Sequence, residues 1–281
     1  MTIAITGATG QLGRLTIAQL KTLTDPAQII ALARDPAKAA DLGVVTRAFD
    51  YTAPDTMADA LQGVDVLVLI SSSDFNDRVG QHRNVVNAAK AASVGRIIYT
   101  SILKADVSPM LIAADHRATE QVIRDAGLTA TILRNGWYSE NWTGNLAGAI
   151  DAGALIGAAG DAPFTPATRG DYAKALAVVA ASDGHEGQIY ELAGDETITL
   201  SDIAAEVSRQ TGKQIPYNNL PGDVYQGILE SFGLPAGFAA VLVDVDVKAD
   251  EGWLVDTSGT LNRLLGGATT PLAQAVRAAL A

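Results

Sequence analysis

The chain has 281 residues, of which 48% are hydrophobic and 18% charged, a balance typical of a folded globular protein rather than a disordered one. Its formal net charge of −11 disfavours nucleic acid and anionic membranes as primary partners, because both need a basic surface. Cysteine is absent, which excludes disulfides and thiolate sites, and no apolar run approaches membrane-spanning length.

The first predicted strand, residues 3–6, runs directly into three glycines with the spacing Gly-x-x-Gly-x-x-Gly and then into a helical pattern. Gly7 allows a sharp turn, Gly10 lets the backbone approach a pyrophosphate, and Gly13 lets the helix pack against the strand. The unpaired N–H groups at the helix start favour phosphate. The motif therefore predicts a dinucleotide site, with the spacing found in short-chain and extended reductases.

Apolar runs alternate with helical patterns through the first half, which predicts a Rossmann-type doubly wound parallel sheet, an α/β fold. The predicted strands span 3–6, 28–33, 44–49, 64–70, 96–99, 129–134 and 188–192. The predicted helices span 11–21, 36–42, 56–61, 81–92, 113–126, 171–181 and 199–211. We expect a dinucleotide-binding domain over 1–134 plus about 160–195, and a smaller α/β substrate-binding domain over about 135–159 and 196–281.

The choice of dinucleotide depends on Arg34, which follows the second strand at the place that contacts the adenine ribose. An acidic residue there would favour NAD, whereas a guanidinium offers planar donors to a 2′-phosphate. Arg34 therefore favours NADPH over NADH, with a solvated loop arginine as the alternative. Asp35, before Pro36, is most simply a helix cap, and Asp50 either borders the adenine or caps the following turn.

Ser71, Ser72 and Ser73 end the fourth strand, where ligands of open sheets bind, and could contact the central part of the cofactor. A serine-rich loop without ligand contacts is the alternative. No signal-like segment precedes the first strand, so we expect a cytoplasmic protein without membrane attachment. A homo-oligomer is compatible with this composition.

The usual reductase pair Tyr-x-x-x-Lys is missing. Tyr99 falls in the fifth strand, and the helix over 113–126 offers instead His116 and Glu120, one turn apart, as an acid–base unit or a simple helical contact. With no cysteine and three histidines we expect no metal. The catalytic candidates are His116 and Tyr138, and neither is assigned.

A quinone accepts hydride without a positioned acid, because its reduced oxygens can take protons from water. A site that holds a nicotinamide beside a flat apolar slot would suit this chemistry, with proximity supplying most of the acceleration. The aromatic residues Trp137, Tyr138 and Trp142 could form the wall of such a slot, or simply pack in the core.

Several motifs resemble those of one family. They are Gly7-Ala-Thr-Gly-Gln-Leu-Gly13, Gln81-His-Arg-Asn84, Leu133-Arg-Asn-Gly-Trp-Tyr-Ser-Glu-Asn141, Ile156-Gly-Ala-Ala-Gly-Asp161 and Ala167-Thr-Arg-Gly-Asp-Tyr172. Nearly end to end, the chain resembles the bacterial NAD(P)H:quinone oxidoreductases of type 2, within the NmrA-like atypical short-chain dehydrogenase/reductase family. Members of this family also lack Tyr-x-x-x-Lys.

The resemblance implies a reductase without flavin that binds NADPH, with NADH weaker, and passes hydride to quinones. By matching position it implies that the cofactor is held by Gly7, Ala8, Thr9, Gly10, Gln11 and Leu12 at the pyrophosphate, Arg34 at the 2′-phosphate, Ser71, Ser72 and Ser73 along its centre, and Tyr138, Ser139, Glu140, Asn141, Trp142, Thr143 and Arg169 at the nicotinamide half. Two alternatives stay open: a dinucleotide-binding redox sensor that regulates a partner, and a reductase of another flat conjugated acceptor such as a dye, imine or enone.

Overall fold

A seven-stranded sheet in the order β3-β2-β1-β4-β5-β6-β8 organises the computed structural model, which describes residues 1–281, and every pair of neighbouring strands is parallel. The strands are β1 (Ile3–Ile5), β2 (Ile29–Ala33), β3 (Val45–Ala48), β4 (Val66–Leu69), β5 (Arg96–Ile102), β6 (Ala130–Asn135) and β8 (Ile189–Leu192). The strand order reverses between β1 and β4, so the crevice expected for a ligand opens at the carboxyl ends of these strands.

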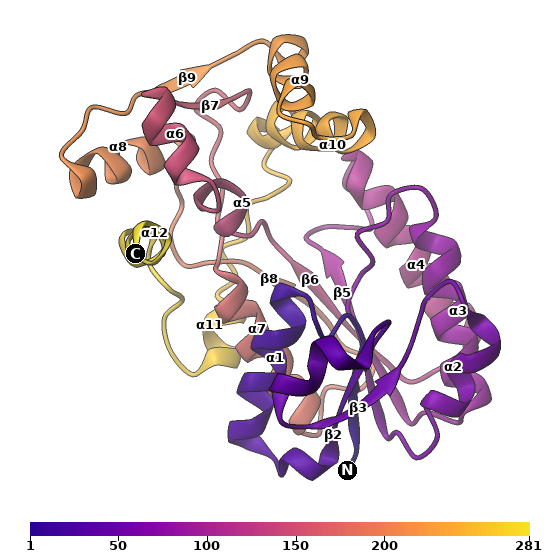
Figure 1. Ribbon diagram of the computed structural model, residues 1–281. Helices are drawn as coiled ribbons and strands as arrows, with labels where there is room; N and C mark the ends of the chain where they lie inside the picture. The colour runs from indigo at the N-terminus through magenta and orange to yellow at the C-terminus, as the bar shows by residue number, and fades with distance from the viewer.

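Helices cover both faces of the sheet, because its central strands are apolar on both sides (Figure 1). One face packs against α1 (Gln11–Leu23), α7 (Arg169–Ala181) and α11 (Thr260–Leu265). The other packs against α2 (Pro54–Ala60), α3 (Arg78–Ala91) and α4 (Leu111–Ala126). The chain also forms three short 3₁₀ helices, η1 (Pro26–Gln28), η2 (Pro36–Leu42) and η3 (Ala249–Glu251).

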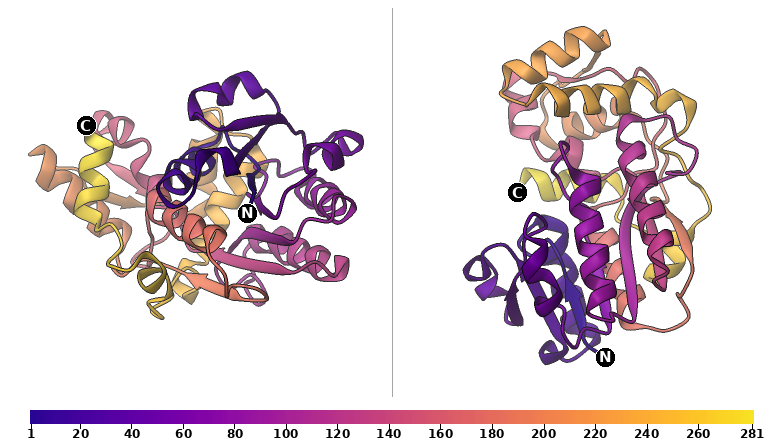
Figure 2. Two further views of the ribbon diagram at one scale, coloured as in Figure 1. Left: turned by 90° about the horizontal axis from the view of Figure 1, so that it is seen from below. Right: turned by 90° about the vertical axis from the view of Figure 1, so that its right-hand side faces the viewer.

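A smaller unit lies beyond the carboxyl ends of the strands (Figures 1 and 2). It contains the parallel pair β7 (Leu155–Gly157) and β9 (Tyr217–Asn219), with the helices α5 (Glu140–Thr143), α6 (Leu146–Ala152), α8 (Leu200–Thr211), α9 (Gly222–Ser231), α10 (Ala236–Val247) and α12 (Leu272–Leu280). Its core is built around Phe164, which is completely buried. The figures show α9 and α10 at the end of the molecule away from the N-terminus.

The predicted doubly wound α/β fold is confirmed, and each predicted strand coincides with an observed one to within three residues at its ends. The fifth strand extends to Ile102, three residues beyond its predicted end at 99. The division into domains stays a prediction, but α11 packs Leu261 and Leu265 into the core beneath the large sheet, although its residues fall within the range expected for the smaller unit. No helix is long and apolar enough to cross a membrane.

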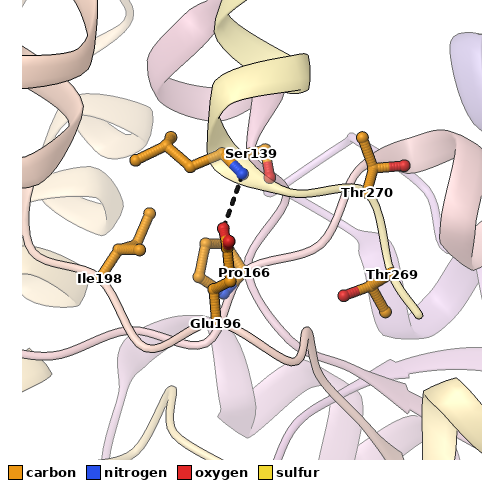
Figure 3. Close-up of a pocket in the computed structure, with 7 residues that line it drawn as sticks. Ser139, Pro166, Glu196, Ile198, Thr269 and Thr270 are labelled. Carbon is orange, nitrogen blue, oxygen red and sulfur yellow. Dashed lines mark hydrogen bonds between the residues drawn. The ribbon is translucent and has the colours of Figure 1, made fainter.

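Helix α12 is held by carboxylates from the sheet side of the molecule. Glu196, which follows β8, accepts the backbone N–H of Leu272 at 2.7 Å, in the first turn of α12 (Figure 3). Asp171 on α7 accepts the backbone N–H and the hydroxyl of Thr270 at 3.1 and 3.0 Å. The small cavity among these residues, about 10 Å³, has room for no more than a single water. These bonds fix α12 against the larger unit.

Candidate functional site

The turn between β1 and α1 has the shape of a phosphate cradle. Gly7 has a φ of +59°, and a Cβ on Gly13 would lie 2.3 Å from the carbonyl oxygen of Gly7, so the helix approaches the turn as closely as glycine permits. Gly10 caps α1 without any side-chain hydrogen bond, and the first turn contains no acidic residue. The free N–H groups at this helix start therefore suit an anionic pyrophosphate.

Of the other residues of the turn, some are buried in the core and others are exposed. Ala8 and Leu12 are buried, so only their backbones can face a ligand, whereas the side chain of Gln11 is exposed. Arg14, which sequence reasoning missed, braces the turn: its guanidinium donates to the carbonyls of Thr9 at 3.3 Å and Lys38 at 2.6 Å. The only feature of the sequence that could have indicated this role of Arg14 is a basic residue one position after the third glycine.

Arg34 lies at the carboxyl end of β2, exposed and with no hydrogen bond to the protein. Its neighbour Asp35 caps the 3₁₀ helix η2 through the backbone N–H of Ala37, as predicted. Asp50 caps its own turn by accepting from the backbone N–H and hydroxyl of Thr52, at 2.9 and 2.8 Å. These bonds, and more weakly the charge of Arg34, hold the pKa of Asp50 below its usual value. The Arg34 guanidinium is thus available to a ligand.

The serine loop after β4 is only partly free. The backbone N–H of Ser72 donates to Nε2 of His82 at 2.8 Å, and its hydroxyl donates to Gln81 at 2.7 Å. The hydroxyls of Ser71 and Ser73 make no hydrogen bond to the protein. Of the three predicted contacts, Ser72 is therefore engaged in holding the loop, and the other two keep hydroxyls for a ligand.

The aromatic residues after β6 point in two directions and do not form one wall. Trp137 is buried in the core of the smaller unit, and Trp142 packs edge-on against Phe164 with ring centroids 4.7 Å apart. Tyr138 instead packs against Tyr172 of α7 at 5.2 Å, and the guanidinium of Arg169 lies over its ring at 4.7 Å. This packing favours the core-packing alternative for both tryptophans, and the cofactor contact of Trp142 stays a prediction.

Glu140 and Arg169 form a paired unit at the start of α7. Both carboxylate oxygens of Glu140 accept the backbone N–H of Arg169, at 2.9 and 3.0 Å, and the guanidinium donates to Asn141 at 2.9 Å. Ser139 and Thr143 are buried beside them. The Glu140 carboxylate thus already occupies the place at the start of α7 where an anionic ligand would bind the free N–H groups.

A groove of about 560 Å³, within the range of small-molecule sites, runs between α1, α5, α7 and α12. It brings together four of the predicted residues, Gln11, Glu140, Thr143 and Arg169. Gln274 of α12 lines the same groove, a contribution that the sequence did not reveal.

The catalytic candidate His116 belongs to a buried polar cluster on the α3–α4 face. Its Nδ1 lies 2.7 Å from the hydroxyl of Tyr99, and His82 Nδ1 lies 2.9 Å from the hydroxyl of Thr119. Burial, and then the charge of Arg78, lower the pKa of His116 well below its ordinary value and that of His82 to about 3. Burial therefore favours the neutral form of both imidazoles.

His116 and Glu120 do not bond to each other, although they are one turn apart. Glu120 accepts from both Nε and NH2 of Arg134, at 3.0 and 2.7 Å, and from the hydroxyl of Ser101 at 2.6 Å. All four residues are buried. Glu120 therefore serves a structural ion pair between α4 and the sheet, and no group of three or more His, Asp or Glu residues could hold a metal.

Comparisons with known proteins agree with this geometry. A family model described as NAD(P)H-binding matches residues 7–181. Quinone oxidoreductase 2 of Escherichia coli is 50% identical over 277 residues, which cover 98% of this chain and 97% of that protein. The crystal structure of an NADPH-dependent quinone oxidoreductase from E. coli in complex with NADPH superposes with a TM-score of 0.96, at 49% identity and 100% coverage of both chains. The NADP(H) complex of Citrobacter triphenylmethane reductase superposes with a TM-score of 0.93, at 34% identity, covering 99% of this chain and 100% of that chain.

Proposed function

The chain belongs to the NAD(P)H-binding family that includes E. coli quinone oxidoreductase 2, and we infer that it is an NADPH-dependent reductase that transfers hydride to quinones. The observation that carries this conclusion is the full-length match, in sequence and in fold, to a quinone reductase complexed with NADPH. The uncapped start of α1 and the glycine turn fit the pyrophosphate of that cofactor.

We propose that the backbone of the turn from Gly7 to Leu12 holds the pyrophosphate and that Arg34 contacts the 2′-phosphate. The free guanidinium of Arg34 supports the second assignment, because a 2′-phosphate offers the acceptors that it lacks in the protein. The hydroxyls of Ser71 and Ser73 and the Tyr138–Arg169 pair would border the rest of the cofactor. Bound NADPH supplies the hydride, and the chain holds it at the carboxyl ends of the strands.

We further propose direct transfer to the quinone, without flavin or metal, in a cytoplasmic protein that acts alone or as a homo-oligomer. The lowered pKa values of His82 and His116 support this view, because burial disfavours the charged imidazole that would act as a strong acid. A quinone needs none, since its reduced oxygens take protons from water. Nucleic acid is disfavoured by the net charge of −11.

Oxidation of NADPH, followed at 340 nm with the purified protein freed of flavin and a panel of quinones, tests this function. The sensor alternative predicts tight NADPH binding without turnover on any acceptor. A reductase of dyes predicts turnover on triphenylmethane dyes that exceeds turnover on every quinone in the panel.

A further inference from the structure

Arg78, in the first turn of α3, is a buried arginine with an unused donor. Its side chain is 4% exposed, and Nε donates to the carbonyl of Ser72 at 2.8 Å. NH1 is completely buried and has no hydrogen-bond partner. The nearest carboxylate, on Asp115, lies 3.8 Å from NH1, beyond hydrogen-bond distance. An unpaired buried guanidinium N–H is costly, which points to an acceptor that arrives from outside the protein.

The surroundings of Arg78 suit a flat acceptor. Its guanidinium lies over the ring of Phe75 at 4.4 Å, and Phe75 in turn packs against Phe238 of α10 with ring centroids 5.3 Å apart. Phe75 lies in the loop between β4 and α3, whereas Phe238 belongs to the smaller unit and is 37% exposed. A flat conjugated ring could stack on Phe75 in place of Phe238, next to the aromatic ring that the guanidinium of Arg78 covers.

The position of Arg78 also connects it to the cofactor region. The Ser72 carbonyl that accepts from Nε belongs to the serine loop at the carboxyl end of β4, beside the topological switch point. On the other side, Arg78 lies close enough to the neutral His82 and His116 for its charge to act on both. The guanidinium is therefore a buried positive charge that acts on two imidazoles whose neutral form is favoured.

We propose that Arg78 stabilises the negative oxygen that forms when a quinone stacked on Phe75 is reduced, an inference that rests on the proposed function. Reduction breaks the C4–H bond of the dihydronicotinamide, forms an O–H bond at one quinone oxygen and adds two electrons to the ring. The second oxygen becomes a phenolate, which is the acceptor that we assign to NH1 of Arg78. A proton from water then completes the hydroquinone. Such a preorganised cation acts mainly where charge develops.

A binding experiment tests this role apart from turnover. The probe is 2-hydroxy-1,4-naphthoquinone, which is an anion at neutral pH, compared with neutral 1,4-naphthoquinone, each titrated into the protein saturated with NADP⁺. Arg78→Met should weaken binding of the anion by roughly 10- to 100-fold, the loss expected for a charged hydrogen bond, and leave the neutral quinone and NADPH within about two-fold. Arg83→Met, an exposed arginine on the same helix with no hydrogen bond, should change nothing.

Two further variants keep the test decisive if Arg78→Met folds poorly. Arg78→Lys retains the charge and should recover part of the anion affinity, and Phe238→Ala should alter the KM for quinones without changing NADPH affinity. The inference is overturned if Arg78 variants lose anionic and neutral quinones equally, or if they lose NADPH instead. Failure of the wild-type protein to oxidise NADPH with any quinone would contradict the proposed function rather than the role of Arg78.

Discussion

The carbonyl oxygen of Gly7 lies 2.3 Å from the point where a Cβ on Gly13 would be, although Gly13 is within a helix and Gly7 lies in the turn that follows β1. This close approach is what sets the start of α1 at the carboxyl end of β1. The two glycines together therefore position the N–H groups that we assign to the cofactor pyrophosphate.

Gly13→Ala should abolish measurable NADPH binding and lower the free energy of unfolding, because the obstructing atoms are backbone and cannot move aside. Calorimetric titration and urea denaturation measure the two effects. Gly227→Ala is the matched control: a Cβ there meets nothing within 4 Å in the middle of α9, so it should gain about 0.5–1 kcal/mol of stability. Normal cofactor binding by Gly13→Ala would contradict the assigned turn.

Arg34→Ala should weaken NADPH binding by about 1.5–3 kcal/mol, the range for a charged hydrogen bond, and leave NADH nearly unchanged. The reason is that the guanidinium has no protein partner, so its removal costs only the contact with the 2′-phosphate. Arg83→Ala, an exposed arginine far from the end of β2 in sequence, serves as the control. Equal losses for the two cofactors would rule out the assignment of Arg34.

Stability should fall below about pH 6.5 partly because of His82. Burial holds the pKa of folded His82 at about 3, against an ordinary value of 6.5. As the pH drops through 6.5, His82 binds a proton in the unfolded chain but not in the folded chain. The contribution of His82 to the free energy of unfolding is therefore full above this pH and declines below it. When the pH falls from 7.5 to 5.5, the free energy of unfolding of His82→Gln should decrease by about 1.4 kcal/mol less than that of the wild type. An unchanged pH dependence in urea denaturation would show that His82 is not buried in its neutral form.

His116→Gln should leave turnover within a few-fold of the wild type, because the imidazole is neutral and its Nδ1 is engaged with Tyr99. Steady-state kinetics with a quinone measures this. A loss of about 10²–10⁴, typical of a removed general acid, would make His116 the proton donor and overturn direct transfer without an acid.

The sequence predicted the larger unit well because its signals are local. Each apolar strand and each helix start, such as Asp35 before Pro36, can be recognised within about ten residues of sequence. The second half carries weaker signals. The three-residue strands β7 and β9 pair with each other, although Leu155 and Tyr217 are 62 residues apart, and no pattern in either segment predicts that pairing.

The glycine turn could be predicted from local sequence, whereas the long-range contacts of the candidate site could not. Glu140 was predicted as a cofactor contact, but only the structure shows that its carboxylate accepts the N–H of Arg169. Trp142 was grouped with Tyr138 as a possible wall of one slot because the two lie close in sequence, whereas Trp142 packs against Phe164 and Tyr138 against Tyr172. Arg78 gave no signal, because its significance arises from Phe75, Phe238 and a missing acceptor that only tertiary structure brings together.

The most direct test of the account is the rate of NADPH oxidation at 340 nm by the flavin-free protein with a series of benzoquinones and naphthoquinones, with NADH measured in parallel. We expect steady turnover on quinones, faster with NADPH than with NADH, and a smaller difference between the two cofactors in Arg34→Ala. Tight NADPH binding without turnover on any quinone would contradict it.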